Sequence, residues 1–368
     1  MTSAPHIHSA ADARRLAKRR LPWMVFDYID GAAGSEVGAD RARAALDAVT
    51  LQPKILRDVS VRDTSVSLFG KTTAMPFGIA PMGMCNLSGV GADLMLARLA
   101  AKHSVPHGVS TVASTPMEKI LEVSEGNAWF QLYFSGDGTG TFKLVERAKA
   151  CGYETLVVTV DVPEVGRRPR ELRHGFKMPF KIGPKQFVDF ALHPRWSLTS
   201  LFAGKPQMAN FLMDGYEFDR TESRAKATWD TLKQLRDMWP GNLVVKGVLD
   251  VEDAVRLKAE GVDAIQVSSH GARQLESAPA PIAVLPEIRA AVGDDFPLFF
   301  GSGLRSGEDE LKALNSGADF AFFGRSLQFA IAAAGEAGLA QLWDVFTDEL
   351  SIGMAQTGIT DVRQLYKA

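Results

Sequence analysis

A titratable imidazole and a permanent cation lie three residues apart in this chain, at His270 and Arg273. They follow the apolar run 264–267, which has the length of a buried strand, so Ser268 and the residues after it stand where that strand would end. On a turn loosened by Gly271, such a pair could take up a proton and hold an anion. The alternative is a strand end with an ordinary surface histidine and arginine, and the remaining sequence has to decide between them.

Short apolar runs recur along the chain from residue 76 onward. Most are separated by 20-odd to 30-odd residues with helical patterns, and glycines such as Gly152, Gly261 and Gly317 precede the next run. Alternation of this kind is typical of a parallel sheet covered by helices. The runs are 77–80, 107–109, 129–133, 156–160, 243–245, 265–267, 298–300 and 320–323.

Eight such units predict an α/β protein with a (β/α)8 TIM barrel over about residues 76–335, within one domain of residues 1–368. An open doubly wound sheet is the alternative architecture. It is disfavoured because no Gly-x-Gly-x-x-Gly follows the first predicted strand.

The segments around the barrel predict a cover and an insertion. Residues 9–20 have a helical pattern that Ser9 can cap, and residues 51–70 suggest a short β cover, so we expect an N-terminal helical/β cover. The long gap after the fourth strand contains an insertion over about 164–220, followed by a helix over about 223–239. Insertions of this length often supply a lid or a partner surface.

Composition narrows the class of protein. Hydrophobic residues make up 46% and charged residues 23%, which is typical of a globular protein, and a net charge of −2 does not suggest nucleic acid as a partner. The two cysteines, Cys85 and Cys151, form no disulfide framework or metal pattern. No apolar run reaches the roughly 18 residues of a membrane span, and no signal peptide is recognised. We therefore expect a cytoplasmic protein without a metal.

In barrels of this kind the active site lies at the carboxyl ends of the strands. Every predicted strand of this chain ends in groups that can titrate, donate hydrogen bonds or bring the backbone close to a ligand, which indicates a bound ligand. These residues are Pro81, Met82, Gly83, Ser110, Thr111, Gln131, Tyr133, Thr159, Asp161, Lys246, Ser268, His270, Gly301, Ser302, Gly303, Arg305, Gly324 and Arg325.

The last two strand ends predict a phosphate site, because glycines let backbone N–H groups approach phosphate oxygens and arginine binds them bidentately. The segments concerned are 301–305 and 324–325. Lys246 could form a Schiff base or remain a cation beside a cofactor. The neutral groups of Ser110, Gln131, Thr159 and Ser268 suit the edge of a flat heterocycle.

Taken together, these motifs make the chain resemble the FMN-dependent 2-hydroxy acid oxidases and dehydrogenases, such as glycolate oxidase and mandelate or L-lactate dehydrogenase. The resemblance runs from about residue 9 to 365. Its most distinctive piece is Ser-Ser-His-Gly-Ala-Arg-Gln at 268–274, against Ser-Asn-His-Gly-(Ala/Gly)-Arg-Gln in the family. Residues 131–133, 159–161, 166–168 and 246–248 agree as well.

The resemblance implies oxidation of an (S)-2-hydroxy acid to the 2-oxo acid with FMN as cofactor, in a homotetramer. His270 would be the base and Asp161 would pair with its imidazole. Arg168 and Arg273 would clamp the substrate carboxylate. The remaining implied roles are a hydrogen bond from Tyr28 to that carboxylate, one from Tyr133 to the substrate hydroxyl, and the cation of Lys246 beside flavin N1 and C2=O.

The chain also departs from the family pattern. Ser269 stands where the family usually has Asn, and Gly301 stands where it usually has Asp. Without that carboxylate a hydrogen bond to the ribityl chain of FMN would be lost, unless Ser302 or water replaces it. Val112 stands where glycolate oxidase carries Trp, which predicts a substrate larger than glycolate. Gly83, where several relatives have Ala, would open space beside the flavin.

Aromatic residues alternate with cations over about 174–216, a composition that suits a membrane surface. The segment is similar to the region by which mandelate dehydrogenase associates with membranes, and a lid or subunit contact is the alternative. NAD is not expected as the electron acceptor, because no dinucleotide fingerprint is present, and this leaves oxygen, a quinone or another carrier.

Two other classes of function stay open at this stage. One is a phosphate-binding barrel enzyme acting on a phosphorylated substrate, either through a Schiff base at Lys246 or through FMN. The other is a protein that binds FMN without catalysis.

Overall fold

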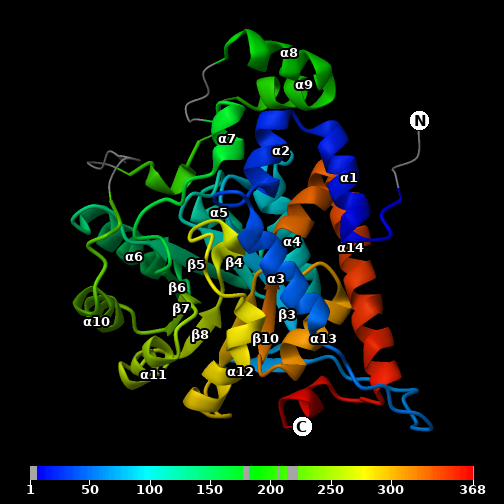
Figure 1. Cartoon of the computed structure of the whole chain (residues 1–368). Coiled ribbons are helices and arrows are strands. Elements are labelled where there is room, and N and C mark those ends of the chain that lie inside the picture. Colours follow the sequence, from blue (N-terminus) through cyan, green and yellow to red (C-terminus); the bar gives the residue numbers. More distant parts are fainter. Residues whose placement is uncertain (1–5, 177–181, 205–206, 214–222, 368) are drawn as a thin grey trace.

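The predicted barrel is confirmed. The computed structural model describes residues 6–176, 182–204, 207–213 and 223–367. Its centre is a closed parallel barrel of eight strands in the order β10-β3-β4-β5-β6-β7-β8-β9 (Figure 1). The strands are β3 (Phe77–Met82), β4 (His107–Ser110), β5 (Ala128–Tyr133), β6 (Thr155–Thr159), β7 (Asn242–Val248), β8 (Ala264–Val267), β9 (Leu298–Gly301) and β10 (Phe320–Phe323).

Helices surround the barrel, and two of them begin at residues that cap them by side-chain hydrogen bonds. Asp250 caps α11 and Ser306 caps α13 through side-chain oxygens that accept backbone N–H groups, which stabilises each helix start. The helices that follow the strands are α4 (Ala92–His103), α5 (Met117–Val123), α6 (Thr139–Cys151), α10 (Trp229–Met238), α11 (Val251–Ala259), α12 (Pro281–Val292), α13 (Gly307–Asn315) and α14 (Arg325–Thr357).

One helix boundary differs from the sequence prediction. Helix α10 begins only at Trp229, because Thr228 caps it and interrupts the helical pattern predicted from residue 223. Helix α14 continues beyond residue 335 to Thr357 after a kink at Ala334 and Gly335, where the backbone leaves the helical region. Close to this kink α14 packs against α1 (Ala10–Arg20), and the Arg20 guanidinium donates to the Ala333 carbonyl (Figure 1).

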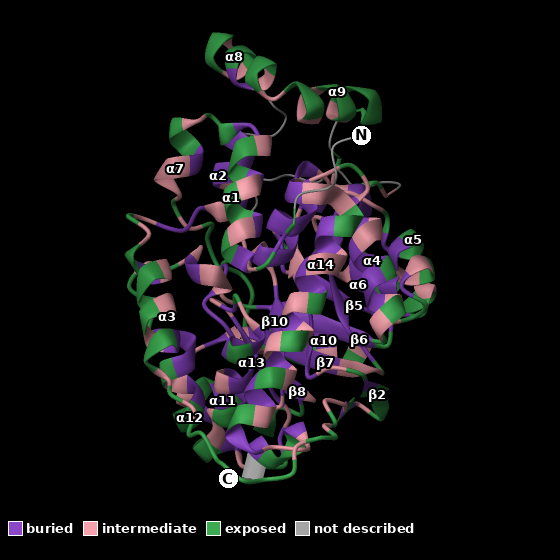
Figure 2. Cartoon of the chain, turned by 90° about the vertical axis from the view of Figure 1, so that its right-hand side faces the viewer, coloured by how far each residue is buried: buried purple, intermediate pink, exposed green. Residues whose placement is uncertain are grey.

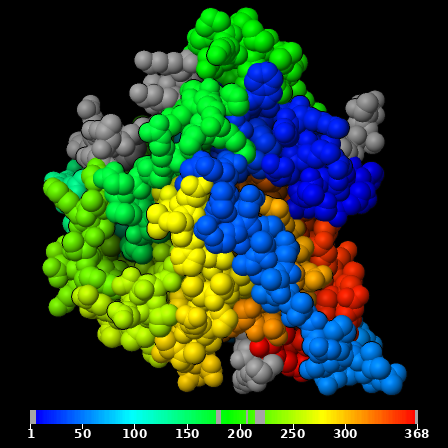
Figure 3. Space-filling view, in the orientation of Figure 1, coloured from blue at the N-terminus to red at the C-terminus, as the bar shows by residue number. Residues whose placement is uncertain are grey.

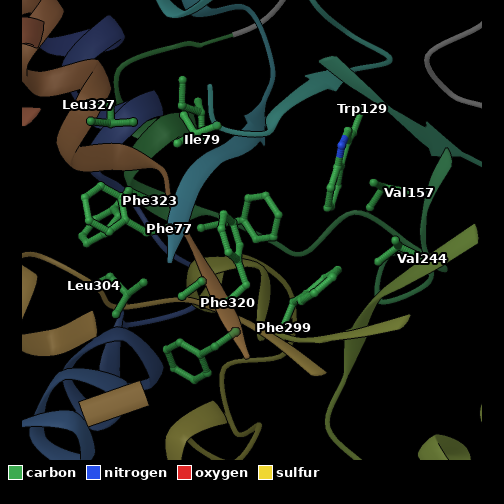
Figure 4. Packing of buried hydrophobic residues seen from close by; sticks show 14 of the residues in the cluster. Phe77, Ile79, Trp129, Val157, Val244, Phe299, Leu304, Phe320, Phe323 and Leu327 are labelled. Carbon is green, nitrogen blue, oxygen red and sulfur yellow. The ribbon is translucent and has the colours of Figure 1, made fainter. Parts of the chain in front are cut away.

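The interior of the barrel is closed by aromatic side chains. Trp129, Phe299 and Phe320 form a chain of ring contacts with centroids 5.8 and 6.2 Å apart, and Val157 and Val244 lie close by (Figure 4). Phe299 and Phe320 are fully buried, and a buried side chain of this size contributes about 1.5–3 kcal/mol of stability. Because this layer fills the barrel below the strand ends, a ligand has room only at the ends themselves.

The N-terminal cover agrees with the prediction in its helix and is shorter in its β part. Ser9 caps α1 by accepting from the Asp12 N–H at 3.1 Å. Helices α2 (Trp23–Asp30) and α3 (Val37–Ala48) follow, and the β cover is a hairpin of β1 (Val66–Leu68) and β2 (Lys71–Thr73). Short 3-10 turns lie at Cys85–Leu87, Ala209–Phe211, His270–Ala272 and Val362–Lys367.

The insertion after β6 forms three further helices, α7 (Pro169–Arg173), α8 (Pro184–Leu192) and α9 (Pro194–Ala203). Helices α8 and α9 project beyond the barrel (Figures 1 and 3), and much of their surface is exposed (Figure 2). Buried Asp189 accepts the Trp23 N–H at 3.1 Å and thereby joins α8 to the start of α2. None of the described helices is long and apolar enough to cross a membrane.

Candidate active site at the carboxyl ends of the strands

The imidazole of His270 contacts two other predicted residues, Asp161 and Tyr133, and the three come from the ends of three different strands. His270 Nδ1 lies 3.0 Å from Asp161 Oδ1, and His270 Nε2 lies 3.3 Å from the Tyr133 hydroxyl. An ionised carboxylate accepts only, so Nδ1 carries the hydrogen and Nε2 is left as the acceptor. The arrangement therefore presents an oriented base with a phenol at its reactive nitrogen.

The turn after β8 holds His270 in an unusual backbone conformation. His270 and Ala272 have positive φ values of 56° and 59°, which non-glycine residues adopt rarely. The hydroxyl of Ser302 accepts the N–H groups of Ser269 and Gly271 at 3.2 and 3.1 Å, and His270 N–H donates to Ser268 Oγ at 3.1 Å. These hydroxyl groups satisfy the backbone of the turn that positions the imidazole.

Asp161 occupies space that only a glycine at position 247 leaves open. Gly247 has φ +106°, and a Cβ atom there would lie 2.5 Å from Asp161 Cγ. Burial raises the pKa of Asp161, but the charges of His270 and Lys246 outweigh burial and lower that pKa below its usual range. Asp161 therefore stays ionised beside the imidazole.

Burial shapes the pKa values of both groups at the centre of the site. It lowers the pKa of His270 to about 4, although Asp161 acts in the opposite direction. It also raises the pKa of Tyr133, and the Asp161 charge adds to that increase. At neutral pH the imidazole is accordingly a free base and the phenol a hydrogen-bond donor.

The two arginines predicted to bind a carboxylate are brought together, and a glutamate that the sequence analysis missed lies between them. Buried Glu171 Oε1 is 2.8 Å from Arg273 Nη2 and 3.5 Å from Arg168 Nη1. Arg273 Nη1 donates to the carbonyls of Tyr28 and Gly31 at 2.8 and 2.7 Å. The signal was available, because Glu171 follows Arg168 at helical i,i+3 spacing on the first turn of α7.

Tyr28 reaches the same region from α2. Its hydroxyl donates to the Gly83 carbonyl at 3.2 Å, and its ring stacks on Phe176 with centroids 4.3 Å apart. The space that the sequence assigned to a missing methyl group at Gly83 is partly filled, because a Cβ atom there would lie 2.5 Å from Val112 Cγ2. Gly83 is therefore a place of close packing with Val112.

The neutral groups predicted to face a flat ring lie on adjacent strands. Gln131 Nε2 donates to Thr159 Oγ1 at 3.0 Å, and Tyr133 pairs in register with Thr159. Ser110 ends β4, and its Oγ accepts the Val112 N–H at 3.3 Å. The β3–β4 register shifts between Ile79 and Met82, so Pro81 and Met82 lie at an irregularity of the barrel rim.

Two buried polar side chains at this level make no hydrogen bond with any described residue. Lys246 is 7% exposed and Gln266, its register partner on β8, is 2% exposed. The polar atoms of both side chains are not sealed from solvent, so they face open space in which a polar ligand can satisfy them. Burial lowers the pKa of Lys246, and Asp161 partly restores it. The donor set fits a flavin, whose polar edge gains negative charge on reduction.

The predicted phosphate-binding residues lie at the ends of β9 and β10, but the guanidinium of Arg325 already has hydrogen-bond partners on the protein. The Arg325 guanidinium donates to the carbonyls of Ile29, Gly31 and Gly271 at 3.1, 2.9 and 2.7 Å, so it ties the α2–α3 loop to the β8 turn. Arg305 is exposed and lines a surface pocket with Arg43. Gly324 starts α14 without a side-chain cap, which leaves N–H groups for a phosphate there.

Comparison with known proteins identifies relatives over nearly the whole chain. The profile of the FMN-dependent dehydrogenase family matches residues 17–368. The (S)-mandelate dehydrogenase of Pseudomonas putida is 37% identical over 368 residues, covering 98% of this chain and 93% of the relative. The L-lactate dehydrogenase of Caulobacter vibrioides is 37% identical over 369 residues, covering 98% and 96%.

Solved structures show the same likeness. The crystal structure of the monotopic membrane protein (S)-mandelate dehydrogenase superposes with a TM-score of 0.92 at 36% identity, covering 98% of both chains. A mandelate oxidase with benzoyl-formic acid superposes with a TM-score of 0.85 at 35% identity, covering 98% of this chain and 97% of that one.

Proposed function

This chain belongs to the FMN-dependent dehydrogenase family, and we propose that it oxidises an (S)-2-hydroxy acid to the 2-oxo acid, with FMN passing the electrons to oxygen or a quinone. The observation that carries the proposal is His270, held between Asp161 and Tyr133 at the rim of the barrel. Relatives named mandelate and L-lactate dehydrogenase support the substrate class.

In this proposal each residue around the imidazole has one task. His270 Nε2 takes a proton from the substrate's C2 or its hydroxyl, and Asp161 stabilises the imidazolium that forms. Tyr133 donates a hydrogen bond to the substrate oxygen. Bound FMN supplies the two-electron acceptor. Lys246 places a fixed cation where negative charge develops during that step.

Arg168 and Arg273 bind the substrate carboxylate, because guanidinium groups match a carboxylate bidentately. Glu171 contacts both arginines, so it holds the two cations close to each other despite their repulsion. Tyr28, which stacks on Phe176, closes the site from the side of α2.

The substrate carries a side chain larger than that of glycolate. Val112 gives the site a small aliphatic wall at the position where glycolate oxidase has a bulky Trp, and the relatives named for mandelate support the same inference.

Anaerobic bleaching of the flavin by a panel of acids tests the proposal. Lactate, longer 2-hydroxy acids and mandelate should reduce the flavin, and oxygen or a quinone should then restore its colour at different rates. Bleaching by glycolate alone would contradict the substrate size. Covalent trapping of a substrate by borohydride would instead favour a Schiff base at Lys246.

We also propose peripheral contact with a membrane through α8 and α9. Phe187, Leu201 and Phe202 are 67, 74 and 87% exposed. In contrast, the rings of Phe190 and Trp196 contact each other in a tilted arrangement, and Trp196 Nε1 donates to the Leu87 carbonyl at 2.8 Å. The relative described as a monotopic membrane protein supports this proposal. Residues 177–181, 205–206 and 214–222, part of the predicted segment, lie outside the described residues.

Sedimentation with anionic liposomes at low salt tests membrane contact. Replacing Phe187 and Phe202 together by Ser should reduce the bound fraction, because apolar side chains supply much of the interfacial affinity. Ile352→Ser, which removes an exposed apolar side chain on α14, serves as the matched control. Equal binding of both variants and the wild type, or no binding by the wild type, would contradict the proposal.

A further inference from the structure

Gln266 is a polar residue in the middle of a buried strand. It lies between Ile265 and Val267 on β8 and is 2% exposed. In register it pairs with Lys246 on β7 and with Phe299 on β9, so it lies beside a ring of the aromatic layer that closes the barrel. In the sequence Gln266 stands inside an apolar run, and a single amide inside such a run is itself a signal of a polar contact.

The side-chain amide of Gln266 makes no hydrogen bond with any residue in the described part of the chain. Leaving a buried amide without a partner is costly, and native proteins avoid it unless water or a ligand satisfies the group. Gln131, another buried amide on the barrel strands, is satisfied by Thr111 and Thr159. Gln266 therefore differs from the protein's other interior strand amide in needing a partner from outside the chain.

The amide points toward the end of β9. A Cβ atom built on Gly301 would lie 2.6 Å from Gln266 Nε2 and 3.9 Å from Ser268 Oγ. Gly301 does not have a positive φ, so the backbone itself would accept other residues there. The absence of a side chain at position 301 is thus matched by the amide that fills its space.

We propose that Gln266 is a cofactor-contacting residue, whose amide hydrogen bonds to FMN beside Lys246 and replaces a polar side chain at position 301. An amide both donates and accepts, so it suits the hydroxyl groups of a ribityl chain and the carbonyl edge of a flavin. The inference rests on the FMN site proposed above. It also accounts for Gly301, because the amide of Gln266 would compensate for the polar side chain that is missing at position 301.

The affinity of the apoprotein for FMN tests the inference without any measurement of turnover. FMN is removed, the apoprotein is titrated with FMN, and the quenching of flavin fluorescence gives Kd. Gln266→Leu, which keeps the volume and removes the amide, should raise Kd about tenfold, the size expected for one lost hydrogen bond. Gln266→Met, which keeps the unbranched chain, should do the same if the Leu variant folds poorly.

Gln341→Leu is the matched control, because its Oε1 accepts the Ile7 N–H at 3.0 Å on α14, outside the strand-end site. That variant should bind FMN like the wild type. An unchanged Kd in both Gln266 variants would overturn the inference. Failure of the wild-type apoprotein to bind FMN at all would instead count against the proposed cofactor site.

A second pair of variants tests the shared space. Gln266→Ala should weaken FMN binding, and adding Gly301→Asn should recover most of the loss, because the new amide enters the volume that Gln266 vacates. If the double variant folds and binds FMN no more tightly than Gln266→Ala, positions 266 and 301 are not interchangeable and the compensation is wrong.

Discussion

His270 Nδ1 lies 3.0 Å from Asp161 Oδ1, although the two residues are 109 positions apart in the chain. The pair fixes the imidazole so that Nε2 faces Tyr133, and it places a permanent negative charge behind the ring. The pKa of His270 is nevertheless lowered to about 4, because burial disfavours the imidazolium more than Asp161 favours it.

Replacing His270 by Ala should leave FMN bound and slow flavin reduction by about 10²–10⁴, the usual contribution of a general base. Anaerobic stopped-flow absorbance measures the reduction, and the flavin spectrum before mixing shows that the cofactor is retained. Near-normal reduction by this variant would remove His270 from the role of base.

Asp161→Asn should slow reduction about 10- to 10³-fold, which corresponds to the one to three pKa units that a neighbouring opposite charge supplies. Because Asp161 raises the pKa of His270, its loss should also move the acid limb of the kcat/KM profile to lower pH. The wild-type limb should fall near pH 4. A slower enzyme with an unmoved limb would mean that Asp161 only supports the local structure.

Arg273→Lys should mainly raise KM for the hydroxy acid, because an ammonium group cannot bind a carboxylate bidentately. The variant also loses part of the three-way contact to Tyr28, Gly31 and Glu171, so a moderate drop in thermal stability is expected. Arg41→Lys is a suitable control, since Arg41 donates to backbone carbonyls at an exposed surface. A change in kcat alone would contradict the carboxylate role.

Ser302 combines a φ of 111° with a hydroxyl that holds the turn around His270. Ser302→Ala and Ser302→Gly should both slow flavin reduction, since both lose that hydroxyl. Only the Gly variant relieves the backbone conformation, so it should be more stable than the Ala variant by about 1 kcal/mol. Urea unfolding gives the stability difference. Normal rates of flavin reduction in both variants would mean that the Ser302 hydroxyl contributes only to the stability of the fold.

His107, buried at the start of β4, predicts a loss of stability in mild acid. Burial lowers its pKa to about 3 from an unfolded value of about 6.5. The unfolded chain therefore binds the proton first, and the contribution to stability is full above pH 6.5 and falls by about 1.4 kcal/mol per pH unit between pH 6.5 and 3. The urea midpoints at pH 7.5 and 5.5 should differ less in His107→Leu than in the wild type. An equal difference in both proteins would exclude His107 as the cause of the loss of stability in acid.

Much of the fold was predictable because the patterns that encode it are local. Each strand is a short apolar run, and many of the following helices have a capping residue or a closing glycine, so the order of elements and the barrel follow from the sequence. The same locality explains the error at α10. Thr228 acts through backbone conformation at a single residue, and a pattern averaged over several residues does not register such an effect.

The sequence by itself also determined which chemical groups stand at the strand ends, because in a parallel barrel all these ends meet on one rim. Only the tertiary structure decided their partners. Glu171 on Arg273, Arg325 on three carbonyls and Val112 against Gly83 all join segments far apart in the chain, and the amide of Gln266 has no hydrogen-bond partner among the described residues. Hydrogen bonding and packing depend on distances in space, and no spacing along the sequence fixes those distances.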